Sequence, residues 1–292
     1  MEYLLLCLSV IMLTLYNLFS DIFSRRIIQT QSDFFTFNTG MSAVASVVFL
    51  VLALIEGSCS LYTLIVGLVF AVVTLAAQFA TIQAMRYGSM ANTAMFNSCG
   101  MLIPTIAGFI FWREKASWIQ IIGVVIIIVS FVIGADLKTR EKMKIKWFGY
   151  ALLLFVCAGL TGVIQKVHQT SEYKNERFSL LFVAFIVMGI TSLIMMFINR
   201  RKDNAAGTKA ARLTPKYIIL FLLTGVCMSF VHPANLYLSG VLPGVCFFPI
   251  INGSPIILCG VLSVFIMKEK ISHTQFISFV IGTVGIIVLS LG

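Results

Sequence analysis

Polar side chains inside long apolar stretches are the residues of this sequence most able to contact a ligand. Such groups are costly in lipid, so they face a cavity or a neighbouring helix. His232 and Asn235 are three residues apart and share one face of a helix, and Pro233 between them predicts a kink. We expect this pair to contact a substrate. The alternative is that His232 is a satisfied packing residue.

Two asparagines lie near the middle of apolar stretches, Asn97 in one and Asn252 in another. Asn252 shares a helical face with Pro249 and Pro255, whose missing N–H groups leave carbonyl oxygens free for a ligand. We expect both asparagines to line a cavity, with nearby aromatic residues, Phe96 and Phe248 among them, as its walls. The alternative is an interhelical hydrogen bond of about 0.6–2 kcal/mol.

Gln78, Asn38 and Lys166 are further candidates. Lys166 lies at the end of an apolar stretch, where it can meet an anionic group of a substrate or pair with Asp21. It can also extend its ammonium group to the membrane surface, as lysines at helix ends do. Glu114, flanked by basic residues, is typical of a structural ion pair rather than a proton carrier.

No catalytic constellation accompanies these polar residues. The sequence has no Gly-x-Ser-x-Gly, no His-Glu-x-x-His, no phosphate-binding loop and no pair of aspartates inside an apolar stretch. Its seven cysteines show neither CxxC nor Cys/His spacing, so we expect no metal site and no disulfide framework. We therefore expect neither an enzyme nor a cofactor.

The composition indicates the class of protein that positions these residues. Of the 292 residues, 59% are hydrophobic and 11% are charged. A soluble domain carries about 25% charged residues, so a soluble enzyme, a nucleic-acid binder and a disordered chain are all excluded. The chain is predicted to be an integral membrane protein.

The charged residues leave nine long charge-free runs, and a helix needs about 20 apolar residues to cross a bilayer. These runs are continuously apolar and do not alternate as barrel strands do, so we interpret them as helices. The run 217–267 is too long for one span, and Leu242-Pro243-Gly244 predicts a turn near its middle. Ten spans follow, in the runs 3–20, 34–55, 57–85, 87–112, 116–135, 147–165, 178–199, 217–267 and 271–292.

Lysine and arginine are distributed unevenly between the connections. Sixteen of the 21 lie in the odd-numbered connections and five, Arg113, Lys115, Lys166, Lys174 and Arg177, in the even-numbered ones. Because basic loops stay in the cytoplasm, we expect the odd connections inside and both termini outside.

A shift of 155 residues lays one segment of the chain on another. Arg-Glu-Lys-Ala-Ser at 113–117 matches Lys-Glu-Lys-Ile-Ser at 268–272, and Asn97 falls on Asn252. The chain therefore divides into a first repeat (1–138), a basic connecting loop (139–146) and a second repeat (147–292). With five spans in each, the second copy crosses the membrane the other way up. The predicted fold is all-α, with ten transmembrane helices arranged as two inverted five-helix repeats.

Together with the segment 240–255, which reads GVLPGVCFFPIINGSP, and the acidic turns at 114 and 269, this pattern resembles the drug/metabolite transporter superfamily, with its EamA-like branch nearest. The resemblance implies a prokaryotic inner-membrane carrier whose central cavity is lined by spans one to four and six to nine. Members are usually drawn with cytoplasmic termini, the reverse of what the loop charges predict here.

We therefore expect a secondary transporter, an exporter or exchanger, that moves a small polar or amphipathic metabolite by alternating access. Its expected partners are that metabolite and membrane lipids, without nucleic acid. A flippase for a lipid-linked headgroup and an intramembrane enzyme are the alternatives.

Overall fold

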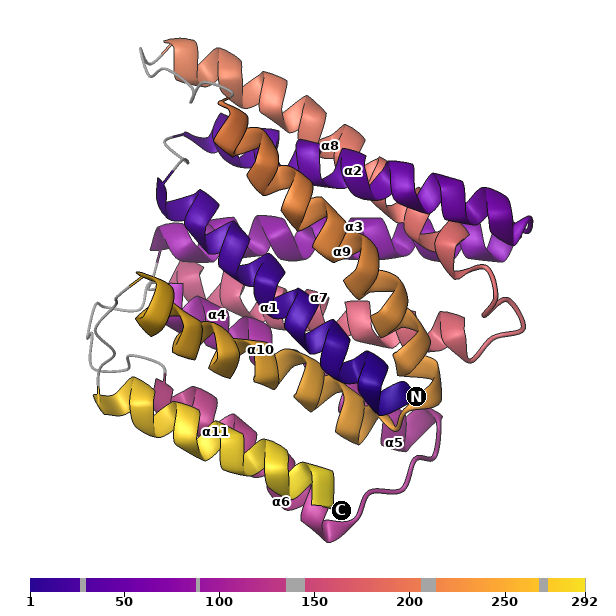
Figure 1. Cartoon of the computed structure of the whole chain (residues 1–292), viewed down its shortest axis with the longest axis vertical. Coiled ribbons are helices and arrows are strands. Elements are labelled where there is room, and N and C mark those ends of the chain that lie inside the picture. The colour runs from indigo at the N-terminus through magenta and orange to yellow at the C-terminus, as the bar shows by residue number, and fades with distance from the viewer. Residues whose placement is uncertain (27–29, 88–89, 135–144, 206–213, 268–272, 292) are drawn as a thin grey trace. The chain divides into compact units, whose positions relative to one another are not determined.

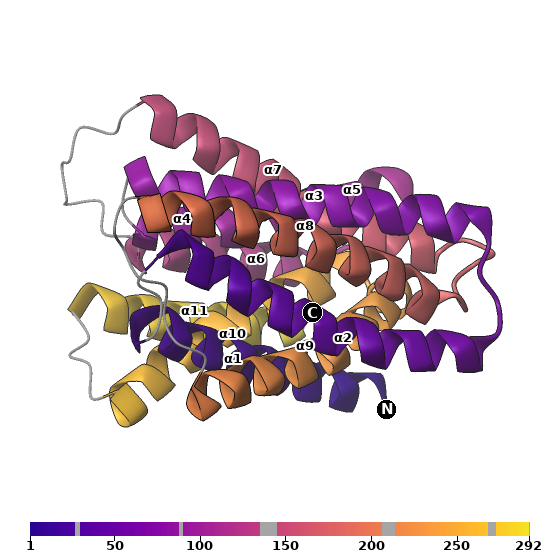
Figure 2. The same cartoon turned by 90° about the horizontal axis from the view of Figure 1, so that it is seen from above.

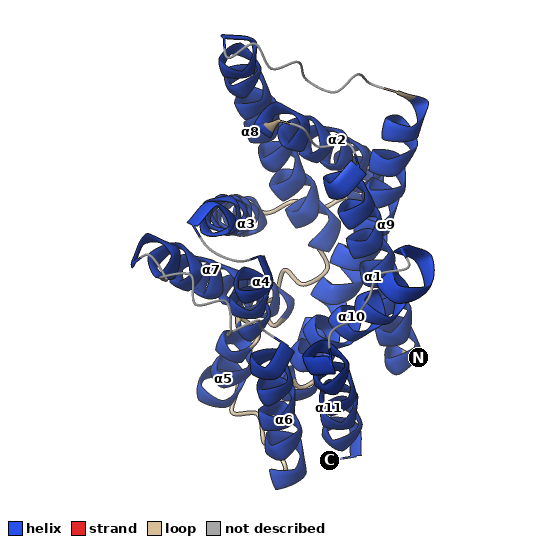
Figure 3. Ribbon diagram, turned by 90° about the vertical axis from the view of Figure 1, so that its left-hand side faces the viewer, coloured by secondary structure: helices blue, strands red, loops and turns tan. Residues whose placement is uncertain are grey.

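The computed structural model describes residues 1–26, 30–87, 90–134, 145–205, 214–267 and 273–291. Within these ranges the chain is helical and contains no strand (Figure 3). Eleven helices are present in them: α1 (Glu2–Arg26), α2 (Gln31–Glu56), α3 (Leu61–Tyr87), α4 (Met90–Cys99), α5 (Leu102–Phe111), α6 (Trp118–Gly134), α7 (Ile145–Gln169), α8 (Arg177–Ala205), α9 (Pro215–Val241), α10 (Gly244–Met267) and α11 (His273–Leu291).

The long apolar run 217–267 folds back where the sequence predicts. Helix α9 ends at Val241 and α10 begins at Gly244. The carbonyl of Pro243 accepts hydrogen bonds from the backbone N–H groups of Cys246 and Phe247, both at 3.0 Å, and so starts the new helix. The predicted turn in this run is confirmed, whereas its division into two membrane spans stays a prediction.

The fourth apolar run forms two short helices in succession, α4 and α5. The backbone N–H of Gly100 donates to the carbonyl of Asn97 (3.1 Å), and that of Met101 donates to the carbonyl of Ser98 (3.2 Å). These bonds reach back three residues, which is tighter than an α-helix and marks a local break. The sequence-based interpretation did not include this interruption.

Six of the helices are long and apolar enough to cross a membrane: α1, α2, α3, α7, α8 and α9. Four shorter apolar segments fall at the predicted fourth, fifth, ninth and tenth spans, namely Met95–Phe111, Trp118–Ile133, Gly244–Cys259 and Phe276–Leu291. The described part of the chain is therefore that of an all-helical membrane protein.

The helices pack into two compact units. Unit 1 contains residues 1–72 and 171–237, and unit 2 contains residues 73–170 and 238–292. Each unit thus takes segments from both halves of the chain. The predicted repeat boundary at 139–146 lies largely outside the described residues, so the division into repeats stays a prediction.

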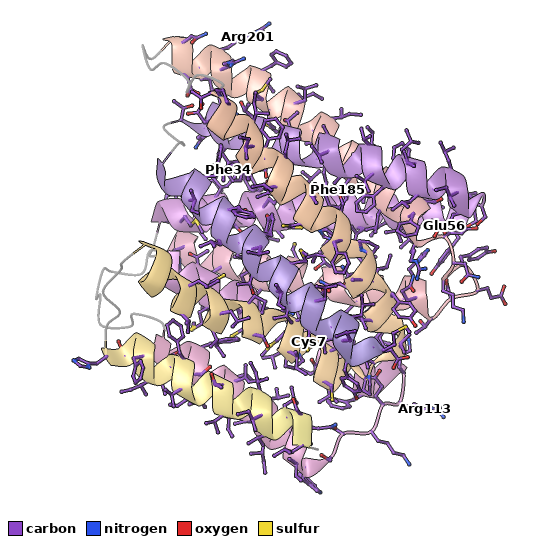
Figure 4. The ribbon with its side chains drawn as sticks, viewed as in Figure 1. Cys7, Phe34, Glu56, Arg113, Phe185 and Arg201 are labelled. Carbon is purple, nitrogen blue, oxygen red and sulfur yellow. The ribbon has the colours of Figure 1, made fainter. Side chains whose placement is uncertain are left out.

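In unit 1, α2 and α8 pack side by side in opposite directions (Figure 1). Glu56 at the end of α2 (labelled in Figure 4) accepts hydrogen bonds from the backbone N–H groups of Phe178 (3.0 Å) and Ser179 (3.2 Å) in the first turn of α8. At the other end, Asp203 in the last turn of α8 accepts one from Ser32 (3.3 Å) in the first turn of α2. Each helix therefore supplies a carboxylate that accepts from the first turn of the other, in α2 beside the capping box of Thr30 and Asp33.

The buried faces of α2 and α8 correspond under one shift. Moving 147 residues along the chain takes Ser32 to Ser179 and Glu56 to Asp203. The same shift takes most buried positions of α2 to buried positions of α8: 32, 33, 37, 38, 41, 45 and 49 fall on 179, 180, 184, 185, 188, 192 and 196. The two helices thus meet through equivalent faces.

In unit 2, α6 and α11 form a second antiparallel pair, and α10 runs beside α11 (Figure 2). A methyl group at Gly285 would lie 2.8 Å from Ile127, and one at Gly282 would lie 3.0 Å from Ser130. The 155-residue shift takes residue 127 to 282 and residue 130 to 285, so these are equivalent contacts. Small residues allow the two helices to approach closely.

Candidate functional site

His232 and Asn235 lie on α9 of unit 1, with Pro233 inside the helix as expected. The Ser9 hydroxyl on α1 donates a hydrogen bond of 2.6 Å to the Oδ1 atom of Asn235. Ser9 is fully buried and Asn235 is half-buried. This bond ties α1 to α9, and sequence reasoning did not identify Ser9 because a serine in an apolar run carries little signal.

The His232 imidazole lies among aromatic rings of unit 1. Its ring is edge-on to Phe185 of α8, with centroids 4.9 Å apart, and edge-on to Phe70 of α3 at 6.3 Å. Phe185 in turn meets Phe49 of α2 at 5.2 Å. Within the described residues the buried Nδ1 atom of His232 has no hydrogen-bond partner. A buried polar atom without a partner costs about 1–3 kcal/mol, so His232 retains an unused hydrogen-bonding position.

Asn38 of α2 also lies in unit 1. It is 7% exposed, on the face of α2 that includes Met41 and Ser42. Its Nδ2 atom and the Ser46 hydroxyl, two turns further along, are buried without a hydrogen-bond partner in the described part of the chain. Asn38 therefore keeps donor capacity inside the unit.

Lys166 lies in the last turn of α7 in unit 2, where its ammonium pairs with the Glu114 carboxylate. The lysine side chain is 3% exposed, so it does not extend to the membrane surface. The expected ion pair of Glu114 is present, and its partner is Lys166. The side chain of Asp21, the partner proposed from sequence, lies outside the described side chains.

The other candidates of α10 are engaged locally. The Asn252 side chain donates a hydrogen bond of 2.8 Å to the carbonyl of Phe248, one turn earlier. Phe248 is 3% exposed, and a methyl group at Gly162 of α7 would come within 2.8 Å of its ring. Phe248 thus packs against α7, whereas half-buried Asn252 is held beside the interior proline Pro249.

The remaining candidates lie in α3 and α4 of unit 2. Asn97 is exposed in the last turn of α4, and its carbonyl accepts the bond that starts the helix break. Phe96 packs edge-on to Trp147 of α7 with centroids 5.5 Å apart, in a cluster with Ala84 and Ala151. Gln78 is half-buried on α3.

The structure thus separates the nine candidates into two groups. Unit 1 holds Asn38, His232 and Asn235, and unit 2 holds Gln78, Phe96, Asn97, Lys166, Phe248 and Asn252. Substrate contact stays a prediction for all of them. Within the described residues, no three His, Cys, Asp or Glu side chains are grouped so as to hold a metal ion.

Comparison with known proteins identifies the class. The model of the EamA-like transporter family matches residues 1–134 and again residues 145–291. These ranges cover nearly the whole chain, and the chain therefore belongs to the EamA-like transporter family, a family of membrane transporters. The resemblance noted in the sequence is confirmed.

Solved structures support the fold. One crystal structure, described only as that of a protein, aligns with 99% of this chain and 97% of its own, with a TM-score of 0.73 and 11% sequence identity. At that identity the likeness concerns the fold alone. No functionally curated protein matches the chain.

Proposed function

We propose that this protein is a secondary transporter that moves a small polar or amphipathic metabolite across a prokaryotic cytoplasmic membrane by alternating access. It is not an enzyme in this proposal. Membership of the EamA-like transporter family supports transport in general. The mode of transport is inferred from the internal symmetry of the helix pairs.

The observation that carries the proposal is the reciprocal capping of α2 and α8. Glu56 caps α8 and Asp203 caps α2, at positions 147 residues apart. Two helices that run in opposite directions and meet through equivalent faces are what an inverted duplication produces. The equivalent contacts of α6 and α11 support the same interpretation. We infer ten spans in two inverted five-helix repeats, which can open alternately to either side.

The site in this proposal uses polar groups with unused hydrogen-bonding capacity. His232 Nδ1 and Asn38 Nδ2, both in unit 1, fit this description. These are neutral donors and acceptors, which suit a polar metabolite. Few acidic residues lie in the predicted spans, so we propose exchange without proton coupling as the default mechanism. In this proposal both termini lie outside, and the distribution of lysine and arginine between the loops supports that orientation.

Two measurements test the function. Purified protein is screened for thermal stabilisation by a panel of labelled amino acids, nucleosides and sugars, and the stabilising compounds are then tested for counterflow in proteoliposomes. We expect at least one compound to accumulate transiently against its own gradient when unlabelled compound is inside. Stabilisation without counterflow, together with movement of a lipid-linked headgroup between leaflets, contradicts the proposal and favours a flippase.

A further inference from the structure

In unit 2, the two oxygens of the Glu114 carboxylate hold two different helices. The Oε1 atom pairs with the Lys166 ammonium at the end of α7, and the Oε2 atom accepts a hydrogen bond of 2.8 Å from the backbone N–H of Gly244, the first residue of α10. We call this arrangement the Glu114 bridge. It joins the turn after α5 to the end of α7 and the start of α10.

Two glycines leave room for the bridge. A methyl group at Gly108 of α5 would lie 2.4 Å from Glu114 Oε2. One at Gly244 would lie 3.1 Å from the same oxygen and 3.3 Å from Lys166 Nζ. Any side chain larger than hydrogen at Gly108 would therefore displace the carboxylate.

The backbone is strained at Arg113, the residue before Glu114. Arg113 has φ +51°, the left-handed conformation that side chains other than glycine rarely adopt. The turn is fixed by the backbone N–H of Glu114, which donates to the carbonyl of Gly108 (3.2 Å). Such backbone strain persists only where the surroundings impose it. Here the bridge supplies that constraint.

The charges of the bridge are almost completely removed from water. The Lys166 side chain is 3% exposed and that of Glu114 is 15% exposed, and the Trp112 ring covers the ammonium at 5.5 Å. Such pairs rarely add stability compared with apolar packing, but removing one partner is strongly destabilising. The buried pair is therefore better suited to fixing one arrangement of the helices than to strengthening the fold.

We propose that Glu114 is a positioning residue that fixes the first turn of α10 to the end of α7, so that these segments move as one body during transport. The inference rests on the proposed transport function for its last clause only. The carboxylate must satisfy both partners at once, because the same group also caps the α10 N-terminus. Glu114 therefore has two roles, as the ion-pair partner of Lys166 and as the cap of α10.

A native cysteine reports on this first turn. Cys246 of α10 is half-buried, and Gln120 Nε2 lies 3.3 Å from its sulfur. In a variant that keeps Cys246 alone, we expect N-ethylmaleimide to label it slowly. Glu114→Ala should raise the labelling rate about tenfold or more above that of Glu114→Gln, which loses the same charge near the thiol but keeps an acceptor for the Gly244 N–H, because only the alanine variant loses the cap of this turn. Equal rates in the two variants would overturn the proposal.

Two controls separate local release from unfolding. Cys157, buried in α7 of the same unit, serves as the only cysteine in a second background. Its labelling rate should rise far less than that of Cys246 with Glu114→Ala; equal acceleration at both cysteines would mean that unit 2 opens as a whole and that the bridge is not local. Glu172→Ala, at an exposed carboxylate, should leave both rates unchanged.

A charge swap tests the dual role. The double variant Glu114→Lys with Lys166→Glu restores an ion pair, but a lysine cannot accept the Gly244 N–H and places a positive charge at a helix N-terminus. We expect rapid labelling of Cys246 to persist. Slow labelling in the swapped protein would show a simple ion pair and refute the bridge.

Transport kinetics complete the test with a substrate that the counterflow assay has identified. Glu114→Gln keeps an acceptor for Gly244 but loses the charge, so the maximal rate should fall several-fold with half-saturation unchanged. A change in half-saturation alone would make Glu114 a binding residue and overturn the positioning role. If the wild-type protein shows no counterflow, the transport proposal fails while the labelling result still decides the bridge.

Discussion

Ser42 of α2 lies directly opposite Gly189 of α8, and a methyl group at Gly189 would stand 3.4 Å from the Ser42 Cβ atom. The 147-residue shift that relates the two helices takes residue 42 to residue 189. A contact between equivalent positions marks the centre of a symmetric helix pair. Small residues there let the helices approach without a cavity.

The first prediction concerns packing against α2 in unit 1. A methyl group at Gly225 of α9 would stand 2.7 Å from Val44 Cβ, whereas at Gly189 the nearest contact is an ordinary one. Gly225→Ala should lower the free energy of unfolding by about 1–3 kcal/mol, whereas Gly189→Ala should leave it unchanged or raise it by up to about 1 kcal/mol. Unfolding by sodium dodecyl sulfate in mixed micelles measures both. Equal effects of the two substitutions would contradict the packing.

The second prediction concerns reciprocal capping. Glu56→Ala removes the acceptor for two N–H groups of α8 and should destabilise the protein by about 1–2 kcal/mol. Glu56→Gln retains an oxygen and should recover much of that loss. Asp203→Ala should cost less, because its bond to Ser32 is longer at 3.3 Å. The same titration with sodium dodecyl sulfate measures the three free energies of unfolding. If Glu56→Ala leaves the free energy of unfolding unchanged, the cap does not contribute to stability.

The third prediction concerns the candidate site. His232→Ala and Asn38→Ala should each lower counterflow of the identified substrate about two- to tenfold while the protein stays monodisperse, since one lost hydrogen bond corresponds to about 0.5–1.5 kcal/mol. His273→Ala, at an exposed histidine that begins α11, serves as the matched control. If both site substitutions leave transport unchanged, the residues only pack and the proposed site is wrong.

The fourth prediction concerns orientation. Single cysteines are placed in the segment 136–146 and after Gly292 of a cysteine-free protein. An impermeant maleimide added to intact cells should label only the second, because the basic loop is predicted inside and the C-terminus outside. Labelling of the loop instead would reverse the assignment and agree with cytoplasmic termini.

Much of the fold follows from local sequence patterns. Apolar runs long enough to cross a bilayer predict helices because backbone groups in lipid must be satisfied within a segment. Pro243 marked the end of α9 correctly, since a proline cannot continue the preceding helix. The break after Cys99 was not predicted, because it depends on bonds at Asn97 and Ser98 that no single residue type announces.

For the candidate residues, the sequence identified some of the side chains but not the partners that they contact. Lys166 was identified because charge is rare in the apolar runs, but its partner depends on a turn 52 residues away in sequence. The hydrogen bond between Ser9 and Asn235, which are 226 positions apart, could likewise not be predicted from the sequence. Phe248 was expected on a cavity wall, whereas its burial against α7 comes from the approach of Gly162.

The sequence by itself determined the membrane class, the helical content and the family, because these depend on composition, segment length and local pattern. Tertiary structure alone decided which carboxylate caps which helix and which polar atoms keep unused hydrogen-bonding capacity. The physical reason is distance along the chain: hydropathy acts over one span, whereas the contacts of Glu56, Glu114 and His232 join segments that meet only after the helices have packed.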